Sequence, residues 1–501
     1  MQVVTPVKEA VVVVVEAGDD TFKSCYQCGL CSGSCPWNLV RNFIPRKIMH
    51  QTQLGLVDFE DEDVWLCLAC GSCAQRCPRG VGTMDVMRDL RRVVTELGLA
   101  EVPDSLRIAL KNIAGTGNPQ GEAEDRTHWA EGLDIKLFTE GTDLMYYSCC
   151  LPSYDPNCKA SAEATVGVLK KAVVDFGILG TTETCCGGTI RKVGNETLFR
   201  NLAERNINAF NESGVKNIIT SSPHCYHTFK NDYPSFSGNF NVVHTTQLLA
   251  QLIDDGRLKP ANELNKKVAY HDPCYLGRHN GTYEEPRKVL RSIPGLDLVE
   301  FPDNRENSIC CGGGSGRVWM ETKKGQRFSD LRLEQAINQG AEVLAVACPA
   351  CMAMFKDSVV SMDKSDIIEI KDISELVRDA CAGTSDPKGG QYKMQQVDTT
   401  FILATHVDEE GFMRESHRWN PEIASQLGKQ QGLEQLTDDH WKVVNSLRDH
   451  YLKFGIPTPV AMLRKDTGMK LEQVKTLFPA GLGRGAVKVA GLPKPPGLYP
   501  W

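Results

Sequence analysis

The chain has 501 residues, of which 41% are hydrophobic and 24% are charged, so it is long enough to form several globular domains. Its net charge of -7 provides no basic surface of the kind that binds nucleic acid, and we expect no nucleic-acid partner. Its 20 cysteines favour a reducing, cytoplasmic location, because oxidation would consume thiols that are needed to bind metal.

A short apolar run lies near the N-terminus, from Val11 to Val15, and predicts a short strand. The run lacks the basic flank of a signal peptide and the ~20 residues that a membrane span requires. We therefore expect no transmembrane segment in this chain. Any attachment to the inner face of a membrane would be made through a partner subunit.

Two copies of one cysteine motif follow. Each reads C-x2-C-x2-C-x3-C-P, which is the pattern of bacterial two-cluster ferredoxins, where the fourth cysteine of one copy binds the cluster of the other. Zinc sites or disulfides are the alternative, but zinc rarely uses this spacing. The motif predicts two 4Fe-4S clusters, one on Cys25, Cys28, Cys31 and Cys77, the other on Cys67, Cys70, Cys73 and Cys35.

Helices are expected around these two cysteine loops. The 31 residues between Cys35 and Cys67 exceed the linker of a compact ferredoxin and leave room for helices. Apolar residues recur with helical spacing from Met84 to Leu97 and stop at Gly98. We predict an all-helical ferredoxin domain over residues 1–105, followed by a linker over residues 106–140.

Residues 141–385 repeat a second cysteine pattern, in which a cysteine is followed by Cys-Cys-Gly and then by a cysteine loop. Apolar runs ahead of the loops predict strands, and helices between them predict a duplicated α/β domain. The first copy spans residues 141–262 and the second spans 263–385. The first contains Cys150, Cys185, Cys186 and Cys225, whereas the second contains Cys274, Cys310, Cys311, Cys348 and Cys351. Ser222 occupies the place of Cys348 in the first copy.

Several other residues near these motifs have alternative interpretations. His271 and His279 flank Cys274, so either is a candidate to donate a proton to a leaving thiolate; a structural histidine is the alternative. Cys149, Cys158 and Cys381 fit neither motif. We expect these three cysteines to be buried as small apolar residues.

Residues 386–501 form a further predicted domain, since the composition changes near Gly389-Gly390 and no cysteine follows Cys381. After Thr437, apolar residues recur at helical spacing up to Gly455, so a mostly helical domain is expected. The proline- and glycine-rich arm from Gly491 to Trp501 cannot form a regular helix.

The segments His271 to Arg278 and Cys310 to Gly314, together with both Cys-Cys-Gly units, resemble the D-type catalytic subunit of heterodisulfide reductase. The related DsrK-like and TmcB-like iron-sulfur subunits of sulfate reduction are similar, over about residues 20–385. The resemblance implies that the complete second unit holds a noncubane 4Fe-4S cluster on Cys274, Cys310, Cys311, Cys348 and Cys351. It implies an ordinary 4Fe-4S cluster, or a lost site, on Cys150, Cys185, Cys186 and Cys225.

The C-terminal region resembles a different family, the DsrC/TusE-type sulfur carriers, through Asp408 to Phe412, Leu477 to Gly481 and Gly491 to Pro495. The two redox cysteines of that family are replaced by Val487 and Leu498. Neither side chain can form a persulfide or disulfide, so this domain cannot itself carry sulfur. It could still dock where a sulfur carrier docks.

These resemblances imply an iron-sulfur oxidoreductase of the heterodisulfide-reductase type. Electrons would pass from the ferredoxin-like clusters to the noncubane cluster, which reduces or forms a disulfide or trisulfide in sulfur or energy metabolism. The implied partners are a flavoprotein or a membrane cytochrome b-type subunit, and a disulfide or sulfur-carrier substrate. Two alternatives remain: an electron-transfer subunit of a lactate- or glycolate-type oxidase, and a regulatory scaffold in which the DsrC-like tail acts as a pseudo-substrate.

Overall fold

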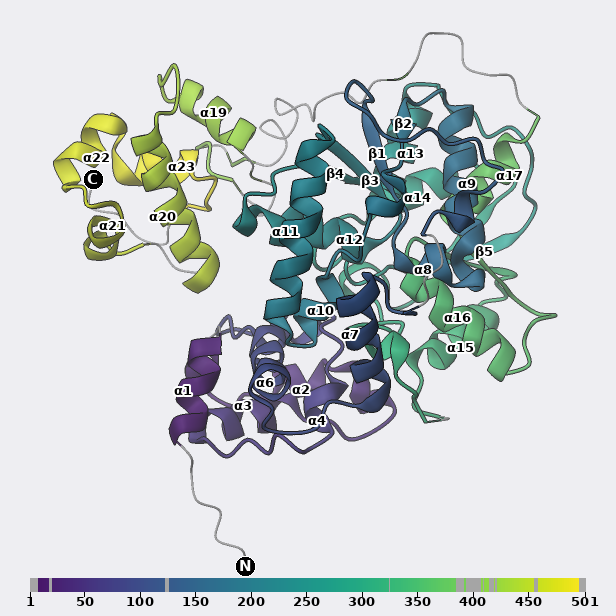
Figure 1. Ribbon diagram of the computed structural model, residues 1–501, viewed down its shortest axis with the longest axis horizontal. Helices are drawn as coiled ribbons and strands as arrows, with labels where there is room; N and C mark the ends of the chain where they lie inside the picture. The colour runs from purple at the N-terminus through teal and green to yellow at the C-terminus, as the bar shows by residue number, and fades with distance from the viewer. Residues whose placement is uncertain are drawn as a thin grey trace, which may run out of the picture. The chain divides into compact units, whose positions relative to one another are not determined.

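A computed structural model describes residues 8–17, 20–121, 126–323, 325–383, 392, 407–408, 410–413, 419, 421–454 and 458–494. The chain divides into two compact units, Met1–Met394 and Gln395–Trp501. Most of the helices of both units and the strands β1 to β5 are labelled in Figure 1. Within the described ranges, every helix is too short or too polar to cross a bilayer.

The N-terminal part of the first unit is helical, as predicted. Its elements are α1 (Lys8–Ala17), η1 (Thr21–Ser24), α2 (Leu30–Gly33), η2 (Pro36–Leu39), α3 (Pro45–Leu54), α4 (Asp63–Leu66), α5 (Ser72–Gln75), α6 (Thr83–Leu97) and α7 (Asp104–Thr116). Helices α3 and α4 lie between the two cysteine loops, which confirms the expected helices there. Helix α6 ends at Gly98, whose φ of 65° closes the helix in the left-handed conformation.

The strand predicted from Val11 to Val15 is wrong, because these residues lie in α1. Helix α1 packs against α3 and α6, and Val14 is buried in that contact. Burial against two helices outweighs the preference of valine for strands.

Helix α7 also enters the segment 106–140 that was expected to be a linker. Its Leu106, Leu110 and Ile113 side chains are buried in the core of the first unit. The start of this segment is therefore a packed helix. It joins the ferredoxin-like helices to the sheets that follow.

Two parallel four-stranded sheets follow, with the orders β2-β1-β3-β4 and β6-β5-β7-β8. The strands of the first are β1 (Leu144–Tyr147), β2 (Phe176–Gly177), β3 (Asn217–Thr220) and β4 (Asn241–His244), and those of the second are β5 (Lys267–Tyr270), β6 (Asp297–Val299), β7 (Val343–Val346) and β8 (Glu369–Asp372). In both sheets the first strand in the chain pairs with the second and third, and the third pairs with the fourth. This identical order confirms the duplication predicted from the cysteines.

Helices connect and cover the strands of these two sheets (Figure 1). They are α8 (Cys150–Tyr154), α9 (Pro156–Lys171), α10 (Gly188–Lys192), α11 (Glu196–Glu212), α12 (Pro223–His227), α13 (Thr245–Asp254), α14 (Glu284–Arg291), α15 (Phe328–Asn338), α16 (Pro349–Ser361) and α17 (Ile373–Cys381). Short α12 and long α16 each follow the third strand of their sheet, so they occupy equivalent places in the two halves.

The second unit is mostly helical in its described residues. Its elements are α19 (Pro421–Gln430), α20 (Asp438–Phe454), α21 (Val460–Thr467), α22 (Leu471–Leu477), η10 (Leu482–Ala486) and α23 (Val487–Val489). The helix predicted after Thr437 is α20. Val487 is buried in the core of this unit. Gly389-Gly390, Gly455 and the arm beyond Lys494, including Leu498, lie outside the described residues.

Within the first unit, the second cysteine loop of the ferredoxin-like part packs directly on the second sheet half. Arg278 donates a hydrogen bond from Nε to the Cys70 carbonyl oxygen at 2.8 Å. A Cβ atom placed on Gly314 would lie 2.2 Å from the Leu68 carbonyl oxygen. The backbone of the Cys-Cys-Gly loop therefore approaches the ferredoxin-like loop so closely that only glycine fits.

We predict that Gly314→Ala lowers the melting temperature of the protein by several degrees, because the added methyl group must displace the Leu68 carbonyl, at a cost of about 1–3 kcal/mol. Gly115→Ala is the matched control, since nothing lies within 4 Å of a Cβ at that position. Anaerobic thermal melts of the two variants provide the measurement. Equal melting temperatures for both would show that the two loops are not in this close contact.

Candidate functional site

The two ferredoxin-like loops share one backbone shape. Gln27 and Gly29 in the first loop, and Ala69 and Gly71 in the second, all have left-handed φ angles between 50° and 86°. These residues turn the chain tightly, so that the cysteines between them converge. The Ala69 N–H donates to the Cys67 Sγ at 3.4 Å. Hydrogen bonds of this kind favour a thiolate and are common at iron-sulfur sites.

The structure brings together the cysteines of each predicted ferredoxin-type set. One cavity is lined by all four thiols of the second set, which are Cys35, Cys67, Cys70 and Cys73. In the first set, Cys25 and Cys28 both contribute to raising the pKa of Cys31, behind the larger effect of burial. Cys28 and Cys77 both act on the pKa of Tyr26, so the last cysteine of the second motif lies beside the first loop. Cys35 of the first motif therefore lies with the cysteines of the second, in line with the crossed assignment.

Five buried thiols converge in the second sheet half. Cys274 follows β5, Cys310 and Cys311 lie on the Cys-Cys-Gly loop, and Cys348 and Cys351 lie at the start of α16. The Cys274 and Cys310 sulfur atoms are 4.0 Å apart, and those of Cys311 and Cys351 are 3.3 Å apart. The thiols of Cys310 and Cys311 also interact, as do those of Cys351 and Cys348. Two of the sulfur pairs are thus in direct contact, and the five thiols form one series of neighbours.

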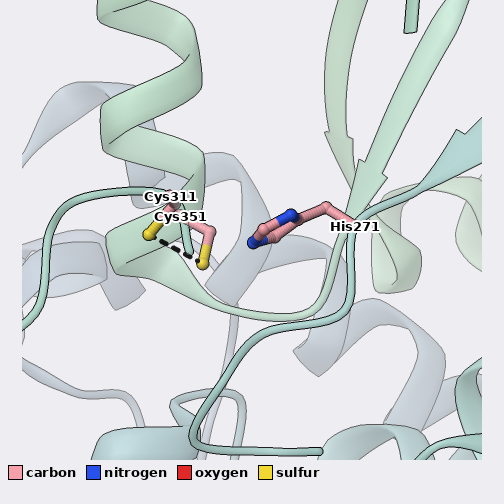
Figure 2. A group of neighbouring side chains, drawn as sticks. All are labelled: His271, Cys311 and Cys351. Atoms are coloured by element: carbon pink, nitrogen blue, oxygen red, sulfur yellow. Dashed lines mark hydrogen bonds between the residues drawn. The ribbon is translucent and has the colours of Figure 1, made fainter. Parts of the chain in front are cut away.

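His271 points toward this group, as Figure 2 shows with Cys311 and Cys351. A ring nitrogen and the two sulfur atoms all lie within 4.8 Å of one another. Burial lowers the pKa of His271, and the nearby Cys311 thiol partly offsets that effect. The imidazole is therefore neutral, and its single N–H is available to the thiol group.

His279 lies in a different environment from His271. Its Nε2 is 3.0 Å from the Ala69 carbonyl oxygen, and its ring stacks on Tyr275 at 4.0 Å. Burial lowers the pKa of His279 well below its ordinary value, so the neutral ring donates its proton to this carbonyl. The geometry makes His279 a contact between the second half and the ferredoxin-like loop.

A thiol contact joins the ferredoxin-like part to the second half. The thiols of Cys70 and Cys310 interact, and this interaction, assisted by the Arg278 guanidinium, lowers the pKa of Cys70 to about 6. The same loop is fixed by the hydrogen bond of Arg278 described above. Two of the predicted cluster sites are therefore neighbours.

The first half also gathers its predicted cysteines. The thiols of Cys150 and Cys185 interact, and those of Cys186 and Cys225 interact in the same way. The Cys185 interaction lowers the pKa of Cys150 to about 7, and Arg126 lowers it further by donating from Nη1 to the Cys150 Sγ at 3.4 Å. No sequence signal singles out Arg126, because it lies 24 positions from that cysteine along the chain.

Lys192 is a buried cation at the junction of the two halves. Its Nζ lies 3.8 Å from the centre of the Tyr275 ring and has no hydrogen-bond partner among the described residues. Burial lowers the pKa of Lys192, whereas Asp232 and, to a smaller extent, Cys186 of the first half and Cys274 of the second raise it. The ammonium group therefore lies in the combined field of Asp232 and of thiols from both halves. A single lysine on a polar stretch carries no sequence signal for this position.

The donor set fits iron-sulfur clusters. Each group consists of cysteine thiols on tight loops, and backbone N–H groups donate to sulfur in both Cys-Cys-Gly loops, from Gly187 to Cys185 at 3.4 Å and from Gly312 to Cys310 at 3.5 Å. Arg126, Arg278 and Lys192 supply positive charge beside the sulfur atoms. Cysteine thiolates are the usual ligands of such clusters, and hydrogen bonds to sulfur tune them.

Three family models match the chain. A 4Fe-4S dicluster domain matches residues 21–81, a cysteine-rich (CCG) domain matches residues 144–230 and 268–356, and a DsrC-like protein model matches residues 403–498. The matches cover the helical N-terminal part, both sheet halves and the second unit.

Curated relatives share most of the first unit. The probable iron-sulfur-binding oxidoreductase FadF of Bacillus subtilis is 37% identical over 66% of this chain, and the EtfAB:quinone oxidoreductase of Syntrophomonas wolfei is 35% identical over 63%. The chain spans about half the length of these two proteins, 48% and 46% respectively. The D-type subunit of the dihydromethanophenazine:CoB--CoM heterodisulfide reductase of Methanosarcina barkeri is 34% identical over 65% of this chain and 79% of its own length. The chain therefore belongs to the family of the D-type heterodisulfide reductase subunits, as a CCG-domain iron-sulfur protein with a 4Fe-4S dicluster domain and a C-terminal DsrC-like domain.

Proposed function

We propose that this protein is an iron-sulfur oxidoreductase in which electrons pass between the ferredoxin-like part and the five-cysteine group of the second half, where a disulfide or trisulfide is reduced or formed. The observation that carries the proposal is that Arg278 and His279, close to Cys274, hydrogen-bond to the Cys70 and Ala69 carbonyl oxygens at 2.8 and 3.0 Å, which makes the two sites neighbours. The proposed domains are residues 1–105, 141–262, 263–385 and 386–501.

The proposal assigns the ligands as the motifs suggest. Two ferredoxin-type clusters are assigned to Cys25, Cys28, Cys31 and Cys77, and to Cys67, Cys70, Cys73 and Cys35; a noncubane cluster is assigned to Cys274, Cys310, Cys311, Cys348 and Cys351. When bound, such clusters supply single electrons, and two electrons with two protons convert one disulfide into two thiols.

The residues between the two halves support an anionic disulfide substrate. The Lys192 Nζ is buried and has no hydrogen-bond partner among the described residues, and it is influenced by Asp232 and by thiols of both halves. Its burial against Tyr275 excludes water, so an anion that reached it would gain more than at an exposed lysine. His271 is the proposed proton donor, since its neutral ring faces Cys311 and Cys351.

A second candidate function is electron transfer between a flavoprotein and a quinone-side partner. The similarity to the EtfAB:quinone oxidoreductase favours it, at 35% identity. In that role the first unit would pass electrons between subunits without disulfide chemistry, and a flavoprotein or a membrane cytochrome b-type subunit would be the partner. The DsrC-like unit would then serve as a docking module, because Val487 cannot carry sulfur.

We predict that Cys311→Ser abolishes disulfide reduction by the anaerobic protein with reduced methyl viologen as electron donor. Cys311 lies at the centre of the five-thiol series, so its loss removes the site while the ferredoxin-like loops stay intact. Iron counts should fall, but the spectra of the ferredoxin-type clusters should persist. Cys381→Ser is the matched control, as a buried cysteine outside the thiol groups.

Full turnover by the Cys311→Ser variant would contradict the assignment of the reaction to this half. If the wild-type protein reduces no disulfide but accepts electrons from a reduced flavoprotein, the second candidate function is favoured instead.

We also predict that Lys192→Met raises the KM for an anionic disulfide such as oxidised glutathione on the order of tenfold, since one buried charge interaction is worth about 1.5–3 kcal/mol. The KM for neutral bis(2-hydroxyethyl) disulfide should change little. Lys216→Met, at an exposed lysine, is the control. Equal changes for both substrates would argue against recognition of the substrate charge by Lys192.

A further inference from the structure

Cys149 is a buried cysteine outside both motifs whose thiol interacts with the thiol group of the first half. It directly precedes Cys150 at the end of β1 and is less than a tenth exposed. Burial raises the pKa of Cys225, and the neighbouring thiols of Cys149 and Cys186 raise it further. The first half therefore gathers five thiols, one more than its motif provides.

The order in which neighbouring thiols influence one another's pKa is the same in the two halves. In the second half it runs through Cys274, Cys310, Cys311, Cys351 and Cys348. In the first half it runs through Cys150, Cys185, Cys186, Cys225 and Cys149. Cys149 thus takes the place of Cys348 at the end of the series, although the two residues come from different elements.

Ser222 holds the place of Cys348 in the sequence repeat, but its side chain is used differently. The Ser222 Oγ accepts a hydrogen bond from the Cys225 N–H at 3.4 Å and so caps α12. Cys348 precedes α16 at the equivalent position and makes no such capping bond, which leaves its sulfur available to Cys351. Position 222 therefore provides no thiol, and the Cys149 thiol, which follows β1, lies near Cys225 instead.

A buried charge beside this group supports a ligand there. The Arg126 side chain is 4% exposed and donates from Nη1 to the Cys150 sulfur. Its Nε donates to the Glu183 carboxylate, whereas its Nη2 has no hydrogen-bond partner among the described residues. A guanidinium with a spare donor suits an anionic group of thiolates and sulfide.

We propose that Cys149 is the fifth thiolate ligand of an iron-sulfur cluster in the first half, in place of Ser222, so that both halves present five thiolates. This extends the proposed function by giving the first half a cluster of the same class as the second. It rests on the iron-sulfur sites of the proposed function and not on the disulfide reaction.

The test is the iron and sulfide content and the Mössbauer spectrum of the anaerobically reconstituted full chain. Cys149→Gly is the main variant, because the Cys149 φ of 71° suits glycine and the change removes only the thiol. We expect it to lose or alter the signal of one cluster, whereas Cys381→Ala leaves all signals unchanged. In the double variant Cys149→Gly with Ser222→Cys, a thiol returns beside Cys225, and we expect the original signal to be restored.

An unchanged iron count and spectrum in Cys149→Gly would overturn the proposal. The proposal would also be overturned if Cys149→Gly lost the signal, Ser222→Cys failed to restore it, and Cys149→Ala, which also lacks the thiol, kept it. The loss would then come from a change in the backbone and not from the missing thiol. Methyl viologen-dependent disulfide reduction is measured separately on the wild-type chain. If that activity is absent but the spectra change as expected, the proposed reaction fails and the assignment of Cys149 stands.

Discussion

The convergence of thiols at the ends of parallel strands is the constraint on which the rest of the first unit depends. In a parallel sheet, the loops after neighbouring strands open at the same edge. The loops after β1 and β3 therefore bring Cys149, Cys150 and Cys225 together, and those after β5 and β7 do the same for Cys274 and Cys351. Such a concentration of buried thiols would be costly as a set of charges without a metal to share them.

The two halves are alike in topology but unlike in their surroundings. Among the described residues, the second half packs on the ferredoxin-like part through the hydrogen bond from Arg278 to the Cys70 carbonyl and the close approach of Gly314 to Leu68. The first half faces its partner half across Lys192 and Tyr275. In this duplicated fold, the thiol group of the second half therefore lies next to the ferredoxin-like loops, whereas that of the first half lies on the other side of the Lys192 ammonium group.

Much of this arrangement could be predicted from the sequence, because cysteine spacing is a local signal with a geometric meaning. The grouping of Cys35 with Cys67, Cys70 and Cys73, the duplication and the helices α6 and α20 all follow from spacing or periodicity. The failures have a common cause. The helix at Val14, the approach of Arg126 to Cys150 and the position of Lys192 all depend on contacts between distant segments, which leave no pattern in the nearby sequence.

The burial of Val487 in the second unit has a consequence for the history of this domain. The residue is 2% exposed and packs in the core through α23. A thiol placed at this position by one substitution would be enclosed by apolar neighbours and could not be reached by an incoming sulfur donor. A sulfur-carrying thiol at this position would therefore require the helix to be unpacked as well as the residue to be replaced.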